Sequence, residues 1–401
     1  MGMTLPLMAR FFEDRAERLG KSVAILYGAN TLGAALGALL AGYLIIPMLG
    51  VFQTTLFAVL LNLLVAYAAI RLHKRVTHPP RVLNNSEITV VEHASVTDNN
   101  LSSDLRRLGY IALAVLGIGG VVTLAIEIKY MHLLAIVAGN STYAFSLMLF
   151  TFLLGLGGGA EIARRLLKND VPLGLTLGLL EFGLAAVILA GVFNWGDMPA
   201  YFASFAQYPV GTTFASREVV RGVVCWLAMF PPALFIGALY PIAMECIGRA
   251  NPQRKIKSLG VAAALNTAGN IGGVLLGGFV LLPHLGVLRS IQLLATVCIV
   301  LGAITLWQTA NLRRWIAWPP AAIATLLLII QPSSFNYTNL ASGANVYLAP
   351  LGWGEVIDHA ESIDGGLTSV AIRQPPNASP VRTLLTNGKF QGNDSIAGEM
   401  Q

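Results

Sequence analysis

The feature that most constrains this chain is an internal duplication within its apolar segments. Residues 30–50 and 266–286 align without gaps at a constant offset of 236, and ten of the 21 aligned positions are identical. The identical pairs include polar, glycine and proline positions, namely Asn30/Asn266, Gly33/Gly269, Gly37/Gly273, Gly42/Gly278 and Pro47/Pro283. The chain therefore contains a duplicated helical unit.

Composition indicates that this unit lies in a membrane. Apolar residues make up 55% of the 401 positions and charged residues only 11%, whereas soluble domains carry about a quarter charged residues. A helix needs about 20 apolar residues to span a bilayer. Runs of about this length predict nine spans, at 22–48, 51–71, 108–137, 141–163, 171–194, 219–247, 258–283, 286–308 and 315–331. Residues 1–9 have the character of the end of another span.

The spacing of the copies predicts repeating units of six helices, because six hydrophobic segments separate the matched residues Pro6 and Pro241. The expected organisation has five parts: the end of a first unit at 1–72, a cytoplasmic linker at 73–107, a complete second unit at 108–308, an extra hydrophobic segment at 309–331, and a β-strand region at 332–401. The first unit is incomplete, so we expect the chain to be a fragment of a longer protein.

Lysine and arginine residues gather on one side of the predicted spans. With alternating spans, that side holds Arg10, Arg15, Arg18, Lys21, Arg164, Arg165, Arg249, Arg313 and Arg314. Short cytoplasmic loops carry such an excess. The net charge of +6 is thus an orientation signal, and nucleic acid is not expected as a partner. The prediction is a multi-pass protein of the bacterial inner membrane, with the lipid bilayer as its main partner.

Ionisable residues within the spans are the candidate functional residues. A charge in the hydrocarbon core is costly and marks a pathway or a partner, and Glu127, Lys129 and Glu181 occupy such positions. One interpretation is a cation or polyamine site lined by Glu127 and Glu181, with the repeat-related Asn30 and Asn266 as further substrate candidates. In the other interpretation, Lys129 extends to the interface, each glutamate bonds to a neighbouring helix, and the asparagines bond across helices.

Neither the cysteines nor the glycines predict a cofactor site. Cys225, Cys246 and Cys298 all lie in predicted spans without metal-ligand spacing, so no disulfide or metal site is expected. The glycine cluster at 155–159 and the glycines of the two copies predict close helix packing. Phosphate loops would need a preceding strand, and none is predicted there.

Near the C-terminus the pattern changes to that of a β-hairpin. Residues 366–373 and 381–386 have strand character, and the turn-forming segment 374–380 separates them. Asn387-Gly388 follows as a second turn signal. If 315–331 spans the membrane, this region lies outside the cytoplasm, whereas a re-entrant or surface-lying segment would leave it inside.

Several runs together resemble the bacterial membrane-bound spermidine synthase-like family. They are 27–42 (YGANTLGAALGALLAG), 139–146 (GNSTYAFS), Glu127 within Ala-Ile-Glu-Ile, 361–362 (ES) and 385–391 (LTNGKFQ). The resemblance covers nearly the whole chain, and the motifs occur in the family's order. Those proteins join a major-facilitator-like helical region to a C-terminal aminopropyltransferase-type domain, which opens with a small β-sheet.

The resemblance implies an all-α, major-facilitator-like membrane region followed by the first strands of the transferase domain. It implies that Gln391 contacts the nucleoside of decarboxylated S-adenosylmethionine, the co-substrate of the full-length protein, although Asn387 replaces the usual aspartate. The catalytic acidic residues would lie beyond Gln401, so no catalytic residue is assigned and no transfer is expected from this chain alone. The alternatives are a polyamine or cation transporter-like protein and a non-catalytic structural subunit that binds other membrane subunits.

Overall fold

The computed structural model describes most of the chain. The described residues are 19–75, 97–169, 171–204, 213–251, 255–308, 314–347, 352–362, 366–376 and 379–395. The predicted helix end at 1–9 and most of the predicted linker, residues 76–96, lie outside them.

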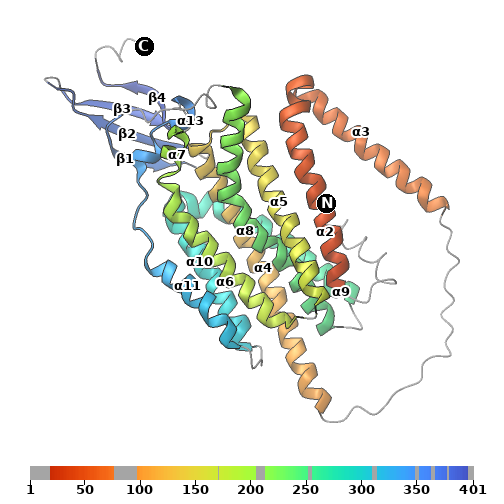
Figure 1. Ribbon diagram of the computed structural model, residues 1–401. Helices are drawn as coiled ribbons and strands as arrows, with labels where there is room; N and C mark the ends of the chain where they lie inside the picture. The colour runs from red at the N-terminus through yellow and green to blue at the C-terminus, as the bar shows by residue number, and fades with distance from the viewer. Residues whose placement is uncertain are drawn as a thin grey trace.

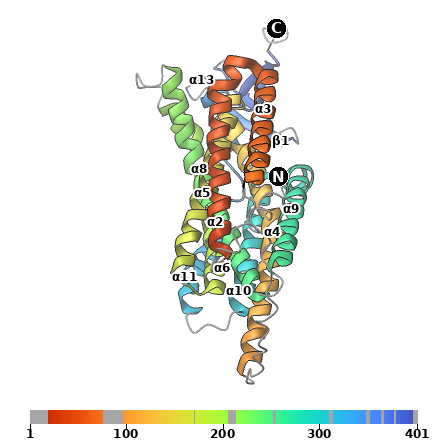
Figure 2. The same cartoon turned by 90° about the vertical axis from the view of Figure 1, so that its right-hand side faces the viewer.

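Long helices form a bundle with a small sheet at one end (Figure 1 and Figure 2). The long elements are α2 (Leu19–Leu40), η1 (Ala41–Ile45), α3 (Ile46–Arg75), α4 (Thr97–Val137), α5 (Thr142–Lys168), α6 (Leu173–Trp195), α8 (Phe214–Ala250), α9 (Lys255–Leu275), η6 (Leu276–Leu281) and α10 (Leu282–Gln308). The short helical elements are α7 (Met198–Ser204), η7 (Arg314–Ala317), α11 (Trp318–Ile329), α12 (Tyr337–Leu340) and α13 (Ala344–Tyr347).

Six helical stretches of the described chain are long and apolar enough to cross a membrane. Two of them, Val23–Leu72 and Lys257–Gln308, each join two predicted spans through a kink. Eight of the nine predicted spans thus coincide with long helices. The ninth, 315–331, forms η7 and α11, and α11 has only 12 residues. At 1.5 Å per residue α11 is about 18 Å long, which is shorter than a bilayer core.

Glycines allow the central helices to approach each other closely. Helix α5 packs on α8 and α2, and α4 packs on α9. A Cβ atom added to Gly159 would overlap the Leu234 carbonyl, and one added to Gly237 would overlap Leu156. The predicted packing role of the 155–159 glycine cluster is therefore confirmed.

The two sequence copies share unusual backbone features at equivalent positions. A π-helical turn interrupts each copy, η1 in the first and η6 in the second. Each copy then kinks at a glycine with positive φ, Gly50 (77°) and Gly286 (69°). Four residues later, the hydroxyl of Thr54 or Ser290 donates to that glycine's carbonyl oxygen. The two copies therefore share local backbone geometry as well as sequence. Duplication of whole six-helix units stays a prediction.

The glycine faces of the two copies have different surroundings. In the second copy, a Cβ on Gly273 would overlap the backbone of Val121 in α4. In the first copy, Gly42 packs on Ser146, but Gly33 and Gly37 have open space beside them. The prediction that both glycine faces pack on neighbouring helices is therefore correct for α9 and wrong for α2. Helix α4 covers the face of α9, whereas no described helix covers the corresponding face of α2.

The C-terminal region is a four-stranded antiparallel sheet rather than a single hairpin. The strands β1 (Glu355–Glu361), β2 (Leu367–Arg373), β3 (Val381–Thr386) and β4 (Lys389–Asn393) pair in chain order. The predicted strands correspond to β2 and β3. Asn387 and Gly388 form the predicted turn, with φ of 49° and 73°. The prediction did not include β4, and it missed β1 because that strand is mostly exposed and lacks an apolar alternation.

The sheet lies at the end of the bundle opposite the basic helix ends (Figure 1). Lys389 Nζ donates to Asn140 Oδ1 at 3.4 Å, immediately before α5 begins. Helix α5 then runs 27 residues, about 40 Å, to the basic residues Arg164, Arg165 and Lys168 at its other end. If the basic end faces the cytoplasm, as predicted, the sheet lies on the other side of the membrane.

Ion pairs form near the basic helix ends. Glu161 bonds to Arg164 at 2.6 Å and to Arg165 at 2.8 Å. Glu245 bonds to Arg249 at 2.8 Å. Glu161 and Glu245 therefore have charged partners. Among the described residues, Glu127 and Glu181 form no such ion pair.

Candidate functional site

A cavity of about 490 Å³ lies among seven helices of the bundle: α2, α4, α5, α6, α8, α9 and α10. Leucine, valine, isoleucine and phenylalanine side chains form much of its wall. All four residues predicted as substrate candidates line it: Glu127, Glu181, Asn30 and Asn266. An apolar cavity with a few convergent polar groups is the usual form of a small-molecule site. The fold thus brings together residues up to 236 positions apart.

Glu181 is the buried carboxylate of this cavity. Its exposed fraction is 1%, and its Oε1 atom has no hydrogen-bond partner among the described residues. The thiol of Cys298, on α10, lies close enough to the same carboxyl group to interact with it. Buried polar atoms are nearly always hydrogen-bonded. An unpartnered carboxyl oxygen in a cavity wall is therefore a position where a donor or a cation would be stabilised.

Glu127 lies beside a pair of aromatic rings. It is partly buried on α4, and the hydroxyl of Tyr27 lies within electrostatic range of its carboxyl group. The Tyr27 ring stacks on Tyr240, with ring centroids 5.1 Å apart and an interplanar angle of 25°. All three residues line the cavity. Carboxylates and aromatic faces both attract ammonium groups.

The repeat-related asparagines contribute amide side chains to the cavity wall. Asn30 on α2 is exposed and Asn266 on α9 is half-buried, in contrast to the fully buried Glu181. Each asparagine is the twelfth residue of its helix and lies close to the middle of it, in α2 (22 residues) and in α9 (21 residues). Of the four candidate residues, Asn30 is thus the least buried and Glu181 the most buried.

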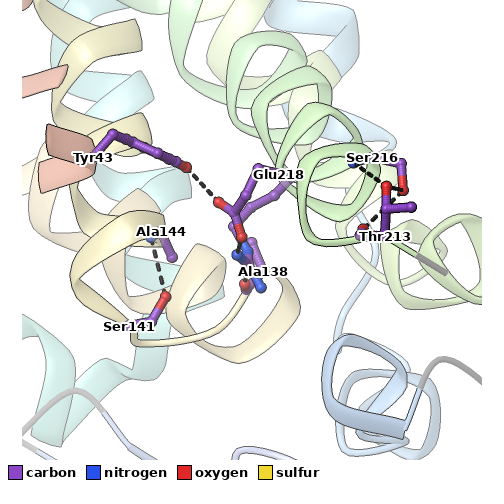
Figure 3. A network of polar contacts seen from close by, with 8 residues as sticks. Tyr43, Ala138, Ser141, Ala144, Thr213, Ser216 and Glu218 are labelled. Atoms are coloured by element: carbon purple, nitrogen blue, oxygen red, sulfur yellow. Dashed lines mark hydrogen bonds and ion pairs between the residues drawn. The ribbon is translucent and has the colours of Figure 1, made fainter. Parts of the chain in front are cut away.

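A polar network ties together the opposite end of the bundle (Figure 3). The Tyr43 hydroxyl, in η1, donates to Glu218 at the start of α8. Glu218 also pairs with Arg221, whose Nε donates to the Ala138 carbonyl at 2.7 Å. The network was not predicted, although the Glu218–Arg221 spacing of three residues at the start of a span was a readable signal.

Lys129 does not extend to an interface, and the prediction that it does is wrong. Its exposed fraction is 0%, and its Nζ donates to the carbonyl oxygen of Gly277, in η6, at 2.6 Å. Glycine at position 277 permits this contact because η6 lies against the backbone of α4: a Cβ there would be 3.0 Å from Ala125 Cα.

Glu361, at the end of β1, connects the sheet to the bundle. Its Oε2 accepts from the Val287 N–H at 2.6 Å, and its Oε1 accepts from the Tyr337 hydroxyl at 3.2 Å. The Tyr337 ring stacks on His359, with centroids 3.6 Å apart. Burial raises the pKa of Glu361 above its ordinary value, while these two donors and the Lys129 ammonium act in the opposite direction. Sequence patterns gave no signal for this contact.

Gln391, the candidate for contact with a nucleoside, is exposed on β4 and is not part of the cavity wall. The three cysteines are buried and are not in disulfides. Among the described residues, no group of three His, Cys, Asp or Glu side chains is placed to hold a metal ion.

Comparison of the chain with protein-family models, with curated proteins and with solved structures gives no match. The resemblance to the spermidine synthase-like family therefore stays a prediction. What the site does has to be inferred from its geometry and chemistry.

Proposed function

We propose that this chain is a multi-pass integral membrane protein whose helical bundle binds a small organic cation, with linear polyamines as the ligand class. The observation that carries the proposal is the buried carboxyl group of Glu181, which lines the cavity with one oxygen unpartnered among the described residues. An isolated carboxylate in an apolar interior is strongly disfavoured. A cationic ligand would supply the missing partner.

The remaining polar groups favour an amine over a metal ion. The stacked Tyr27 and Tyr240 rings provide aromatic faces for an ammonium group, and the asparagine side chains provide carbonyl acceptors. The apolar part of the wall suits the methylene chain that joins the amines of a polyamine. Two carboxyl groups, Glu127 and Glu181, match a ligand with at least two ammonium groups.

This proposal takes the transporter-like alternative as the function that the described residues support best. Aminopropyl transfer by a longer protein would use the same amine chemistry, but the described sheet supplies no glycine-rich phosphate loop or crossover helix. A purely structural subunit would not require an unpartnered carboxyl group in an internal cavity.

Calorimetric titration of the purified chain with putrescine tests the proposal. We expect saturable binding of putrescine and spermidine, and none of 1,4-butanediol, which has the same carbon chain with hydroxyl groups in place of amines. Equal heats for putrescine and 1,4-butanediol, or no binding of either amine, would reject the proposed function.

The orientation of the chain gives a separate prediction. The native cysteines are buried, so a cysteine introduced at an exposed position can be labelled selectively. In intact cells, a membrane-impermeant maleimide should label Arg382→Cys, on the sheet, and should spare Lys168→Cys, at the basic end of α5. Permeabilised cells should show labelling of both variants, which controls for reactivity. Labelling of Lys168→Cys alone in intact cells would contradict the assigned orientation.

A further inference from the structure

We propose that Glu361 and Lys129 are positioning residues of the cavity, through which the C-terminal sheet holds α4 and α10 in the ligand-binding arrangement. The inference rests on the proposed function of the cavity. It goes beyond that function because neither residue lines the cavity. Both act through the helices that carry its polar groups.

Glu361 caps a helix that begins inside α10. Gly286, with φ of 69° and ψ of 174°, breaks the helical path, so a new helical segment begins at Val287. The first amide groups of a helix lack intrahelical partners and attract negative charge. The Glu361 carboxylate fills this role at 2.6 Å from the Val287 nitrogen. A Cβ on residue 286 would make an ordinary van der Waals contact with this oxygen at 3.5 Å, so the positive φ, rather than crowding, favours glycine here.

The first sequence copy shows the same helix start without a cap from the sheet. Val51 is the equivalent of Val287, and it follows the equivalent kink at Gly50. Val51 is 70% exposed, whereas Val287 is 1% exposed. The backbone of the repeat therefore does not itself require a carboxylate at this position. The contact with Glu361 is specific to the copy that faces the sheet.

Lys129 makes the corresponding contact from α4. It follows Glu127 by two residues, about 200° around the helix, so the two side chains lie on nearly opposite faces of α4. Lys129 bonds to the Gly277 carbonyl, which also accepts the backbone N–H of Leu282. Its ammonium also interacts electrostatically with Glu361. The Lys129 hydrogen bond thus joins α4 to η6 behind the face of α4 that carries Glu127, and the charge of Lys129 attracts Glu361 on the sheet.

Helix α10 links the same junction to the buried end of the cavity. Cys298, whose thiol interacts with the Glu181 carboxyl group, lies 11 residues after Val287, about three helical turns or 16 Å along one helical segment. A continuous helix transmits a shift at its start to side chains further along it. Loss of the Glu361 cap should therefore displace Cys298 and α4 relative to Glu181.

The test uses the purified chain in lipid nanodiscs and the variant Glu361→Ala. We expect faster amide hydrogen exchange in the residues after Gly286 and a putrescine affinity reduced by about fivefold or more, the lower range of typical coupling between sites. Added formate should restore both properties, because it can occupy the vacated carboxylate position. Glu355→Ala, which removes an exposed carboxylate from the same strand, should change neither property.

Unchanged exchange and unchanged affinity in Glu361→Ala would overturn the proposal. If Glu361→Ala does not fold, hydrogen exchange and putrescine affinity are measured on Glu361→Gln instead. Glutamine keeps an oxygen for the Val287 N–H but lacks the charge opposite Lys129, so it should show intermediate affinity, and wild-type affinity would count against the proposal. If the unmodified chain binds no putrescine, the proposed function fails. Hydrogen exchange and formate rescue still decide whether the junction exists.

Discussion

Replacing Glu181 with glutamine is expected to weaken putrescine binding by at least about tenfold, with little loss of stability. A hydrogen bond to a charged group contributes about 1.5–3 kcal/mol, and glutamine cannot supply the negative charge. Stability should change little because one carboxyl oxygen of Glu181 has no partner among the described residues. Calorimetric titration gives the affinity, and thermal unfolding of the same samples gives the stability. Glu127→Gln should show the same direction with a smaller effect, because Glu127 is only partly buried.

Glu161→Gln is the matched control for these variants. It removes one negative charge from the basic end of α5, where Glu161 pairs with Arg164 and Arg165 rather than lining the cavity. Its putrescine affinity should equal that of the unmodified chain. Equal affinities for the unmodified chain, Glu127→Gln and Glu181→Gln would reject the binding site.

The second large effect is expected from Gly273→Leu, which should strongly reduce the yield of folded protein. A Cβ atom alone would overlap the Val121 backbone, so leucine would force α9 away from α4. Overpacking of a well-packed interface typically costs about 1–3 kcal/mol, and sometimes more. Size-exclusion profiles and thermal unfolding of the detergent-purified variant measure the loss.

The duplication itself provides the control, because Gly37 occupies the equivalent position in the first copy. Gly37 has open space around it, so Gly37→Leu should give a folded yield close to that of the unmodified chain. If both variants are equally destabilised, the loss would reflect a general effect of the added leucine, such as impaired membrane insertion, rather than packing against α4. If both are tolerated, the close contact between α9 and α4 would be disproved.

Much of the helical organisation could be predicted from the sequence because long apolar helices appear in it as apolar runs of matching length. Apolar length located eight of the helices, and the repeat identified Gly50 and Gly286 as equivalent before their shared kink was known. Charge in apolar segments selected Glu127 and Glu181, which the fold then placed around one cavity. Charged groups are costly to place in hydrocarbon. They are therefore rare in apolar segments and informative where they occur.

Contacts between distant segments could not be predicted in the same way. Glu361 and Val287 are 74 positions apart, and neither helical nor strand periodicity relates them. Lys129 was expected at an interface because a lone lysine in a span usually extends there. Its actual partner is a backbone carbonyl in a π-helical turn, and such a turn carries no clear sequence pattern. The open glycine face of α2 was missed because identical residues in the two copies suggested identical neighbours.

The sequence repeat relates two amide side chains of the cavity but not its two carboxyl groups. Asn30 and Asn266 come from equivalent positions of the repeat, but Glu127 and Glu181 do not, and only Glu181 is fully enclosed. A linear ligand would therefore meet comparable amides along its length and different electrostatic environments at its two ends. Spermidine has a three-carbon arm and a four-carbon arm, so its two orientations would differ in energy. The site would then bind spermidine in one preferred direction, whereas the symmetric putrescine would have two indistinguishable orientations.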